Sequence, residues 1–220
     1  MSERLNNGHL AVPPSGKGAG VLVLHAWWGL TSFIQDFCDR LALEGFVALA
    51  PDLFSGKVAR TIEEAEQLGS SLNEEQDVPP RVLSAMEELR KHPAVTGNGL
   101  GTVGFSLGAY WALWLAQQKP ELIRAVTLFY GTNGGGGDFQ QSKAAFLGNF
   151  AETDPYEPAE GIQALQKNLE GANRPTTFYT YAGAGHWFFE KDRQDAYRPQ
   201  AAQLAWDRTI AFLHEQLDGG

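Results

Sequence analysis

The chain has 220 residues, of which 43% are hydrophobic and 20% are charged, as is usual for a globular domain. Its 17 basic and 26 acidic residues give a formal net charge of −9, which argues against nucleic acid or an anionic membrane as the partner. The sequence shows no signal peptide and no apolar run that could span a bilayer, and the single Cys38 cannot form an internal disulfide. We therefore expect one domain over residues 1–220, located in the cytoplasm and acting on a small molecule.

The first predicted elements form a β-α-β unit. Residues 21–24 and 46–50 are apolar runs of strand length. Between them, residues 31–44 carry apolar side chains at helical spacing, with Thr31 or Ser32 as the N-cap and Gly45 at the end. On this stripe Cys38 is expected to be a small buried hydrophobic residue.

The rest of the chain repeats this alternation. Further strands are predicted at residues 100–105, 125–130, 144–150 and 176–181, and helices at residues 61–68, 82–91, 109–116, 161–169 and 201–217. Alternating strands and helices imply a mostly parallel sheet with helices on both faces, so the predicted fold class is α/β. Little length is left for a cap domain, and we therefore expect an open site.

The most informative motif is Gly104-Phe105-Ser106-Leu107-Gly108, because it joins a predicted strand to a predicted helix. In this context G-x-S-x-G is typical of a nucleophile elbow, the sharp turn that presents the serine of an α/β-hydrolase. The glycines keep Cβ atoms out of the crowded corner. Ser106 is therefore the candidate nucleophile, with an ordinary strand-to-helix turn as the alternative interpretation.

A serine needs an oriented base, and in α/β-hydrolases the acid and the histidine follow the serine in that order, each after a strand. His186 fits best, because it follows the strand at 176–181 in a loop of small residues. The other four histidines fit less well: His9, His25 and His92 precede the serine, and His214 lies in the last predicted helix.

Asp154 is the candidate acid. It follows the strand at 144–150, and Pro155 favours an extended backbone at this position. There it would accept a hydrogen bond from His186 and stabilise the imidazolium form. Glu152 is the nearest competitor, and Asp138 lies beside the glycine run at 134–137, which we expect to be a flexible loop near the active face.

An oxyanion hole needs two backbone N–H groups. The Leu107 N–H directly follows the nucleophile, and the second donor is expected from the loop after the first strand, where Trp27 is our choice and Ala26 the alternative. The predicted substrate pocket is lined by Ala26, Trp28, Phe54, Tyr130 and Trp187.

Six motifs in chain order cover nearly the whole sequence: LHAWWGL at 24–30, PDLF at 51–54, GFSLG at 104–108, FYG at 129–131, DPYEP at 154–158 and AGAGHWF at 182–188. In this order and spacing they resemble the dienelactone hydrolase family of α/β-hydrolases. The resemblance implies an α/β-hydrolase fold with little or no cap. It also implies that Asp154 and His186 are the acid and the base, in agreement with the choice from loop position.

Three positions differ from the family's usual pattern. The family's nucleophile is usually cysteine, where this chain has Ser106, and the glutamate that controls that cysteine falls at Ala26. These two changes fit together, because a serine hydroxyl is not ionised in advance as a thiol can be. The family's carboxylate-binding arginine falls at Glu190, so we expect a neutral ester rather than dienelactone itself, with Arg60 and Arg81 as other arginines that could serve.

We therefore expect a serine carboxylesterase of the dienelactone hydrolase type that cleaves small neutral esters or lactones through an acyl-enzyme. No cofactor is expected, and neither an H-E-x-x-H motif nor a cysteine pair is present to hold a metal. Two alternatives stay open: an acyltransferase or perhydrolase with the same triad, and a non-catalytic binding module with the same fold. The expected partner is a small-molecule ester, and the sequence leaves the oligomeric state open.

Overall fold

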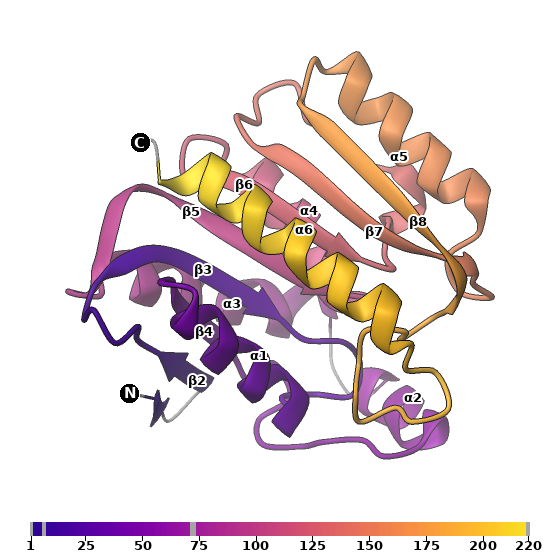
Figure 1. Cartoon of the computed structure of the whole chain (residues 1–220), viewed down its shortest axis with the longest axis horizontal. Helices are drawn as coiled ribbons and strands as arrows, with labels where there is room; N and C mark the ends of the chain where they lie inside the picture. Colours follow the sequence, from indigo (N-terminus) through magenta and orange to yellow (C-terminus); the bar gives the residue numbers. More distant parts are fainter. Residues whose placement is uncertain (1, 6–7, 71–73, 219–220) are drawn as a thin grey trace.

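A single sheet runs through the protein, whose structure is a computed structural model that describes residues 2–5, 8–70 and 74–218. Within these residues the sheet has eight strands in the order β1-β2-β4-β3-β5-β6-β7-β8 (Figure 1). Its parallel part consists of β3 (Gly18–Leu24), β4 (Val47–Pro51), β5 (Val95–Phe105), β6 (Ile123–Phe129), β7 (Ala145–Thr153) and β8 (Thr176–Gly185). The predicted α/β class and the six predicted strands are confirmed.

An antiparallel hairpin at the β4 edge was not predicted. β1 (Ser2–Leu5) pairs with β2 (Gly8–Ala11), and β2 pairs in turn with β4. Each strand has only four residues, too few to show the alternation that marks a half-buried strand. His9 lies on β2, where its Nε2 is 2.8 Å from Asp39 Oδ1.

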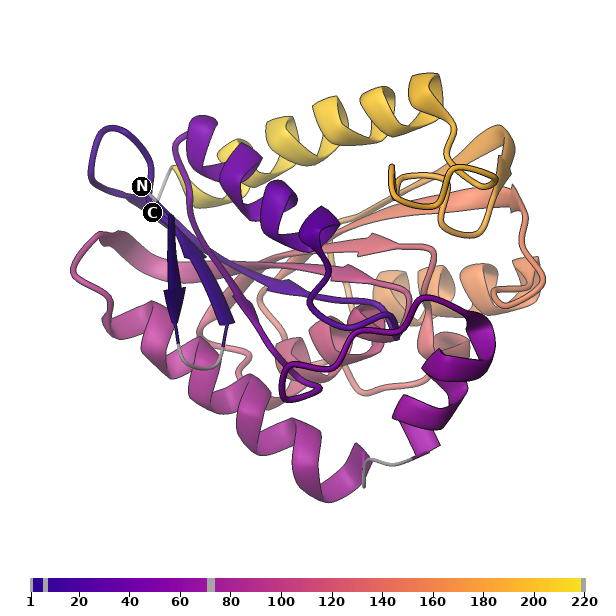
Figure 2. The ribbon, with the colours of Figure 1, turned by 90° about the horizontal axis from the view of Figure 1, so that it is seen from below.

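Helices cover both faces of the sheet, as Figure 2 shows. One face carries α1 (Ser32–Leu43) and α6 (Pro199–Leu217), and the other carries α3 (Glu74–Lys91), α4 (Leu107–Gln118) and α5 (Ala159–Gly171). Each face has its own cluster of buried apolar side chains. A parallel sheet needs this double cover, because its strands are apolar on both sides.

The first helix follows the predicted pattern. α1 buries Phe33, Ile34, Phe37, Cys38 and Leu41, which recur every three or four residues and so share one face. Its N-cap has extended backbone, and the chain leaves the helix through a glycine at 45 with φ of 98°. The Cys38 thiol is 0% exposed, and burial raises its pKa far above the ordinary value, so its prediction as a buried hydrophobic residue is confirmed.

The third helix begins eight residues earlier than predicted. We expected a helix over residues 82–91, but α3 starts at Glu74 and contains Pro79 and Pro80. Proline has a φ close to the helical value, but inside a helix it removes one N–H donor and its ring crowds the carbonyl four residues earlier. The loss is offset by packing, since Val78 and Val82 are both buried against the sheet.

The parallel strands end at one edge, and the candidate site lies there. Ser106, Asp154 and His186 directly follow β5, β7 and β8. Near this edge α2 (Ile62–Ser70) lies beyond the two helical layers (Figures 1 and 2). None of the helices in the described part of the chain is long and apolar enough to cross a membrane.

Candidate active site

Ser106 lies in a strained turn between β5 and α4. Its φ is 51° and its ψ is −112°, a combination that L-residues rarely adopt. The turn is possible because the residues two positions before and after Ser106 are glycines. A Cβ on Gly104 would collide with the backbone of Gly108 and Ala109, and a Cβ on Gly108 would collide with the carbonyl of Leu24. This geometry is that of a nucleophile elbow.

The structure brings Ser106, His186 and Asp154 into one hydrogen-bonded chain. Ser106 Oγ is 3.0 Å from His186 Nε2, and His186 Nδ1 is 2.7 Å from Asp154 Oδ2. The His186 and Asp154 side chains are only 4% and 2% exposed. Since Asp154 must accept at Nδ1, Nε2 is left free to accept the serine proton. The arrangement can therefore activate Ser106 for attack on a carbonyl carbon.

The other oxygen of the Asp154 carboxylate is held by the backbone. Oδ1 accepts the N–H groups of Tyr156 at 2.9 Å and of Glu157 at 3.1 Å. These two bonds hold the carboxylate in place just after β7. Pro155 separates Asp154 from the first donor in the sequence. The competitor acids have other partners: Glu152 accepts the Gly183 N–H at 2.8 Å, and Asp138 accepts a backbone N–H in its own loop.

The remaining histidines lie away from Ser106 or contact other groups. His92 Nδ1 accepts the Ala94 N–H at 3.2 Å, and His214 Nδ1, on the last turn of α6, is 2.6 Å from Oδ2 of Asp218, which follows the helix. His25 is buried directly after β3, and the groups within hydrogen-bond distance of its ring nitrogens are backbone groups.

A second carboxyl group beside Asp154 was missed from the sequence. Glu157 Oε2 accepts a hydrogen bond from Thr132 Oγ1 at 2.5 Å. Burial raises the pKa of Glu157, the Thr132 bond lowers it, and the Asp154 charge raises it. The only sequence signal was its place in the DPYEP motif.

The two predicted oxyanion donors belong to segments that contact each other. The Leu107 N–H belongs to the first turn of α4, where the helix itself offers no acceptor. A side chain at Gly108 would touch the carbonyls of both Leu24 and His25, so α4 begins in close contact with the loop that carries Trp27. The alternative donor, Ala26, belongs to the same loop.

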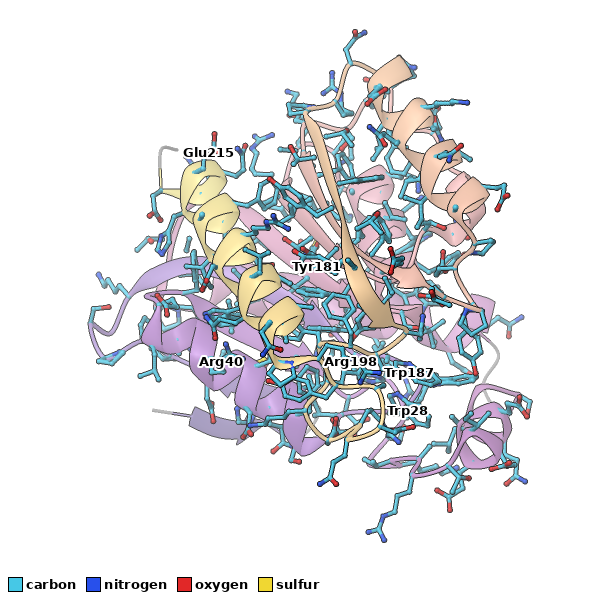
Figure 3. The ribbon with its side chains drawn as sticks, turned by 45° about the vertical axis from the view of Figure 1, so that its right-hand side comes forward. Trp28, Arg40, Tyr181, Trp187, Arg198 and Glu215 are labelled. Atoms are coloured by element: carbon cyan, nitrogen blue, oxygen red, sulfur yellow. The ribbon has the colours of Figure 1, made fainter. Side chains whose placement is uncertain are left out.

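Four aromatic residues, which we call the aromatic cluster, pack on one another beside His186: Trp27, Trp28, Tyr156 and Trp187. Ring centroids of Tyr156 and Trp187 are both 4.9 Å from that of His186. Trp28 and Trp187 lie side by side near the loop that leads into α6 (Figure 3), with centroids 5.2 Å apart. Trp187 holds a φ of 64°, a strained value for a bulky residue.

The aromatic cluster contains hydrogen-bond donors that have no acceptor among the described residues. The indole N–H groups of Trp27, Trp28 and Trp187 are buried, and none has a hydrogen-bond partner among the described residues. Buried donors of this kind are costly unless water or a ligand accepts from them. The cluster is therefore an apolar wall with a few hydrogen-bond donors beside the catalytic candidates.

Tyr130 lies behind His186 and does not line an open pocket, contrary to expectation. It is 0% exposed, and its ring centroid is 4.9 Å from that of His186. Its hydroxyl donates to Glu190 Oε1 at 2.8 Å, and Glu190 is 2% exposed. Burial raises the pKa of Glu190 to about 8, although the Tyr130 bond lowers it. Glu190 is therefore mostly protonated near neutral pH and is not the repelling charge that we expected.

Two other predicted pocket residues also lie in the core. Phe54 is 3% exposed and packs edge-on against His25 within the cluster that holds α3 and α4. Ala26 is 2% exposed and packs on the α1 side of the sheet with Trp28. Both follow strands, as the sequence indicated, but the side chain of a strand-end residue can turn to either face.

The arginine beside the aromatic cluster is Arg193, which the sequence did not single out. Its guanidinium lies 3.4 Å from the centroid of the Trp28 ring, and its Nη1 donates to the Arg60 carbonyl at 3.2 Å. Arg81 instead binds the Leu53 carbonyl at 2.6 Å. It lines a cavity of about 840 Å³ between the end of β4 and α3, whose lining includes none of the three catalytic candidates.

The glycine run at 134–137, which we expected to be a flexible loop, accepts two hydrogen bonds from α5. The Asn168 side chain on α5 donates to the carbonyls of Gly135 and Gly137, at 3.1 and 2.9 Å. A Cβ on Gly135 would strike Ala164, so the close approach to α5 requires glycine. Among the described residues, no group of three or more histidine, cysteine or acidic side chains could hold a metal ion.

The profile of the dienelactone hydrolase family matches residues 7–217. This chain belongs to the dienelactone hydrolase family. It is 33% identical to Protein usf of Aquifex pyrophilus over 96% of this chain and 93% of the relative. It is 32% identical to a probable 2-oxo-3-(5-oxofuran-2-ylidene)propanoate lactonase of a Bradyrhizobium species, over 93% and 87%.

A solved structure of a putative dienelactone hydrolase from Klebsiella pneumoniae shares the fold. It superimposes with a TM-score of 0.81 at 23% identity, covering 94% of this chain and 92% of that chain. As a member of the dienelactone hydrolase family, the protein is a hydrolase that acts on ester bonds. The α/β-hydrolase fold and the family resemblance are thus confirmed.

Proposed function

We propose that this dienelactone hydrolase family member is a serine carboxylester hydrolase that works through an acyl-enzyme. The observation that supports this best is the hydrogen-bonded path from Ser106 Oγ to His186 Nε2 at 3.0 Å and from His186 Nδ1 to Asp154 Oδ2 at 2.7 Å. The strained backbone of Ser106 adds support, because strained backbone conformations cluster at active sites, where they hold a reactive side chain in position.

The reaction follows from this geometry. Ser106 Oγ attacks the ester carbonyl carbon while His186 Nε2 takes its proton, and the N–H groups of Leu107 and Trp27 stabilise the oxyanion. The tetrahedral intermediate collapses, the bond to the leaving oxygen breaks, and His186 returns the proton to the alcohol. Water then attacks the acyl carbon while His186 takes its proton, the bond from that carbon to Ser106 Oγ breaks, and His186 returns the proton to Oγ as the acid is released. Asp154 stabilises the imidazolium form in both steps.

Small neutral esters or lactones are the first candidate substrates. The surface beside His186 is the aromatic cluster, which favours an apolar or planar group by burial and ring contacts. No free carboxylate has to be neutralised for such a substrate to bind.

A lactone that carries a carboxylate is the second candidate, and Arg193 is the observation that favours it. Its guanidinium lies against Trp28, and its buried Nε has no partner within the described part of the chain. Glu190 does not oppose an anion, because its raised pKa keeps it mostly neutral. The Bradyrhizobium relative is named as a lactonase of an acidic substrate.

The nucleophile is tested by active-site labelling with a fluorophosphonate and by the acetylation burst with p-nitrophenyl acetate. Wild type is expected to label on Ser106 and to give a burst. Ser106→Ala is expected to abolish both, whereas Ser84→Ala, on the exposed side of α3, serves as the matched control. A burst that survives in Ser106→Ala would refute the assignment.

The same labelling separates the other functions. A non-catalytic binding module would not react with the probe. An acyltransferase or perhydrolase would react, but would transfer the acyl group to an added alcohol or to peroxide in preference to water, which product analysis detects. For substrate charge, we would compare a lactone that carries a free carboxylate with the same lactone whose carboxylate is masked as a methyl ester, following opening of the lactone ring in wild type and in Arg193→Gln. Loss of activity on the carboxylate lactone alone would favour the second candidate.

A further inference from the structure

His25 is a fully buried imidazole that the catalytic triad does not use. It follows β3 directly and is 0% exposed. Both ring nitrogens contact backbone groups. Nε2 accepts the Leu53 N–H at 3.1 Å, and Nδ1 is 2.7 Å from the carbonyl oxygen of Ala26. A buried ring with two backbone partners has a fixed orientation.

These partners also define the tautomer. A backbone N–H can only donate, so Nε2 must be unprotonated and the single ring proton is on Nδ1. Burial lowers the pKa of His25, while the Ala26 carbonyl and the Asp52 charge raise it, and the net shift is downward. His25 is therefore neutral, with Nδ1–H donating to the Ala26 carbonyl.

The Ala26 carbonyl belongs to the peptide that carries the Trp27 N–H. This oxygen accepts two hydrogen bonds, from His25 Nδ1 at 2.7 Å and from the Gly29 N–H at 3.1 Å. In a trans peptide the C=O and the following N–H are antiparallel, so fixing one fixes the other. The His25 ring thus fixes the direction of the Trp27 N–H, because it holds the carbonyl on the other side of the same peptide.

This peptide lies where the nucleophile turn meets β3. Gly108 approaches the carbonyls of Leu24 and His25 so closely that a Cβ there would collide with both. The Leu107 N–H, one residue earlier, therefore belongs to the same corner as the Trp27 N–H. If both N–H groups bind the same oxyanion, a change in the direction of either one weakens its stabilisation.

We propose that His25 is a positioning residue for the oxyanion hole: its Nδ1–H holds the Ala26 carbonyl and thereby aims the Trp27 N–H at the developing charge. The proposal rests on the proposed serine esterase function. It assigns a role to a histidine that touches neither the substrate nor Ser106.

Two substitutions separate the two hydrogen bonds of the ring. His25→Asn places an amide near the position of Nδ1, so it can keep the donor to Ala26. His25→Gln places its carbonyl oxygen near the position of Nε2, so it can keep the acceptor for Leu53 and lose the donor to Ala26. We expect His25→Gln to lower kcat by about 10- to 100-fold, somewhat less than removal of an oxyanion donor, with little change in KM.

The deciding readout is the ratio of kcat/KM for an ester to that for its thionoester, in which sulfur replaces the carbonyl oxygen. An oxyanion hole aimed at oxygen favours the ester, so the ratio should fall in His25→Gln and should fall less in His25→Asn. A purely structural loss of folded enzyme lowers both rates together and leaves the ratio unchanged. Thermal melts of each variant establish the folded fraction.

An unchanged ratio in His25→Gln, or an equal fall in His25→Asn, would overturn the proposal. If His25→Gln does not fold, His25→Asn decides alone: a ratio near the wild-type value supports the role, and a collapsed ratio contradicts it. Fluorophosphonate labelling of the same preparations distinguishes a failure of the His25 proposal from a failure of the esterase proposal. Labelling on Ser106 with an unchanged ratio refutes only the role of His25, whereas absence of labelling in wild type refutes the esterase proposal as well.

Discussion

The Tyr130 hydroxyl donates to the Glu190 carboxyl at 2.8 Å, and the two side chains are 0% and 2% exposed. This pair connects the end of β6 to the loop that follows His186. Burial raises the pKa of Tyr130 as well as that of Glu190, so both groups are neutral near pH 7. The pair is a hydrogen bond between neutral groups, and the Tyr130 ring packs against His186.

Glu190 should make stability depend on pH. Its pKa is about 8 in the folded chain against an ordinary 4.5, so the folded state retains a proton that the unfolded chain loses. Its contribution is complete below about pH 4.5 and is lost as the pH rises towards 8. Glu190→Gln should therefore gain stability relative to wild type across this interval, by up to a few kcal/mol. Urea unfolding at several pH values measures the difference, and a difference that does not change with pH would contradict it.

Asp154→Asn should reduce kcat by about 10³- to 10⁴-fold, because it reverses the hydrogen bond to His186 Nδ1 and favours the wrong tautomer. Glu157→Gln is the matched control, since Glu157 lies nearby but is bonded to Thr132. We expect that control to lose far less activity. Steady-state kinetics on p-nitrophenyl acetate compares them, and similar losses in both variants would rule out Asp154 as the specific partner.

Gly108→Ala should destabilise the protein by about 2–4 kcal/mol, because its Cβ would overlap the Leu24 carbonyl and push α4 away from β3. Gly171→Ala, at the end of α5, meets nothing within 4 Å and should be neutral or slightly stabilising. Chemical denaturation distinguishes the two. A neutral Gly108→Ala would mean that the turn can relax, and that its tight packing is not required.

Tyr156→Ala should raise KM for aryl esters by about 2- to 10-fold, in line with the worth of one aromatic contact. The ring contacts His186, Trp27 and Trp187, and 45% of the residue is exposed. Leu204→Ala on α6 is a control of equal exposure that lies away from the aromatic cluster. Equal effects on aryl and alkyl esters would show that Tyr156 does not contact the leaving or acyl group.

The predicted triad residues come together because their positions follow from local rules. Ser106, Asp154 and His186 each follow an apolar run, and parallel strands end at one edge of a sheet. The pocket residues were harder to predict. Phe54 and Tyr130 also follow strands, but their direction depends on partners distant in sequence, namely His25 and Glu190.

Other differences have the same origin. Arg193 reaches Trp28 through a loop without periodicity, so no sequence pattern indicated the contact. The early start of α3 was hidden by Pro79 and Pro80, which normally predict a boundary. In each case long-range packing decided what the local sequence left open.

Cys38 gives the fold a natural reporter. It is the chain's only cysteine, and it lies on α1 against the sheet with no exposed surface. A thiol reagent can reach it only when α1 separates from the strands beneath it. The rate of labelling, compared with that of the unfolded chain, therefore measures the free energy of that opening under native conditions without any engineered probe.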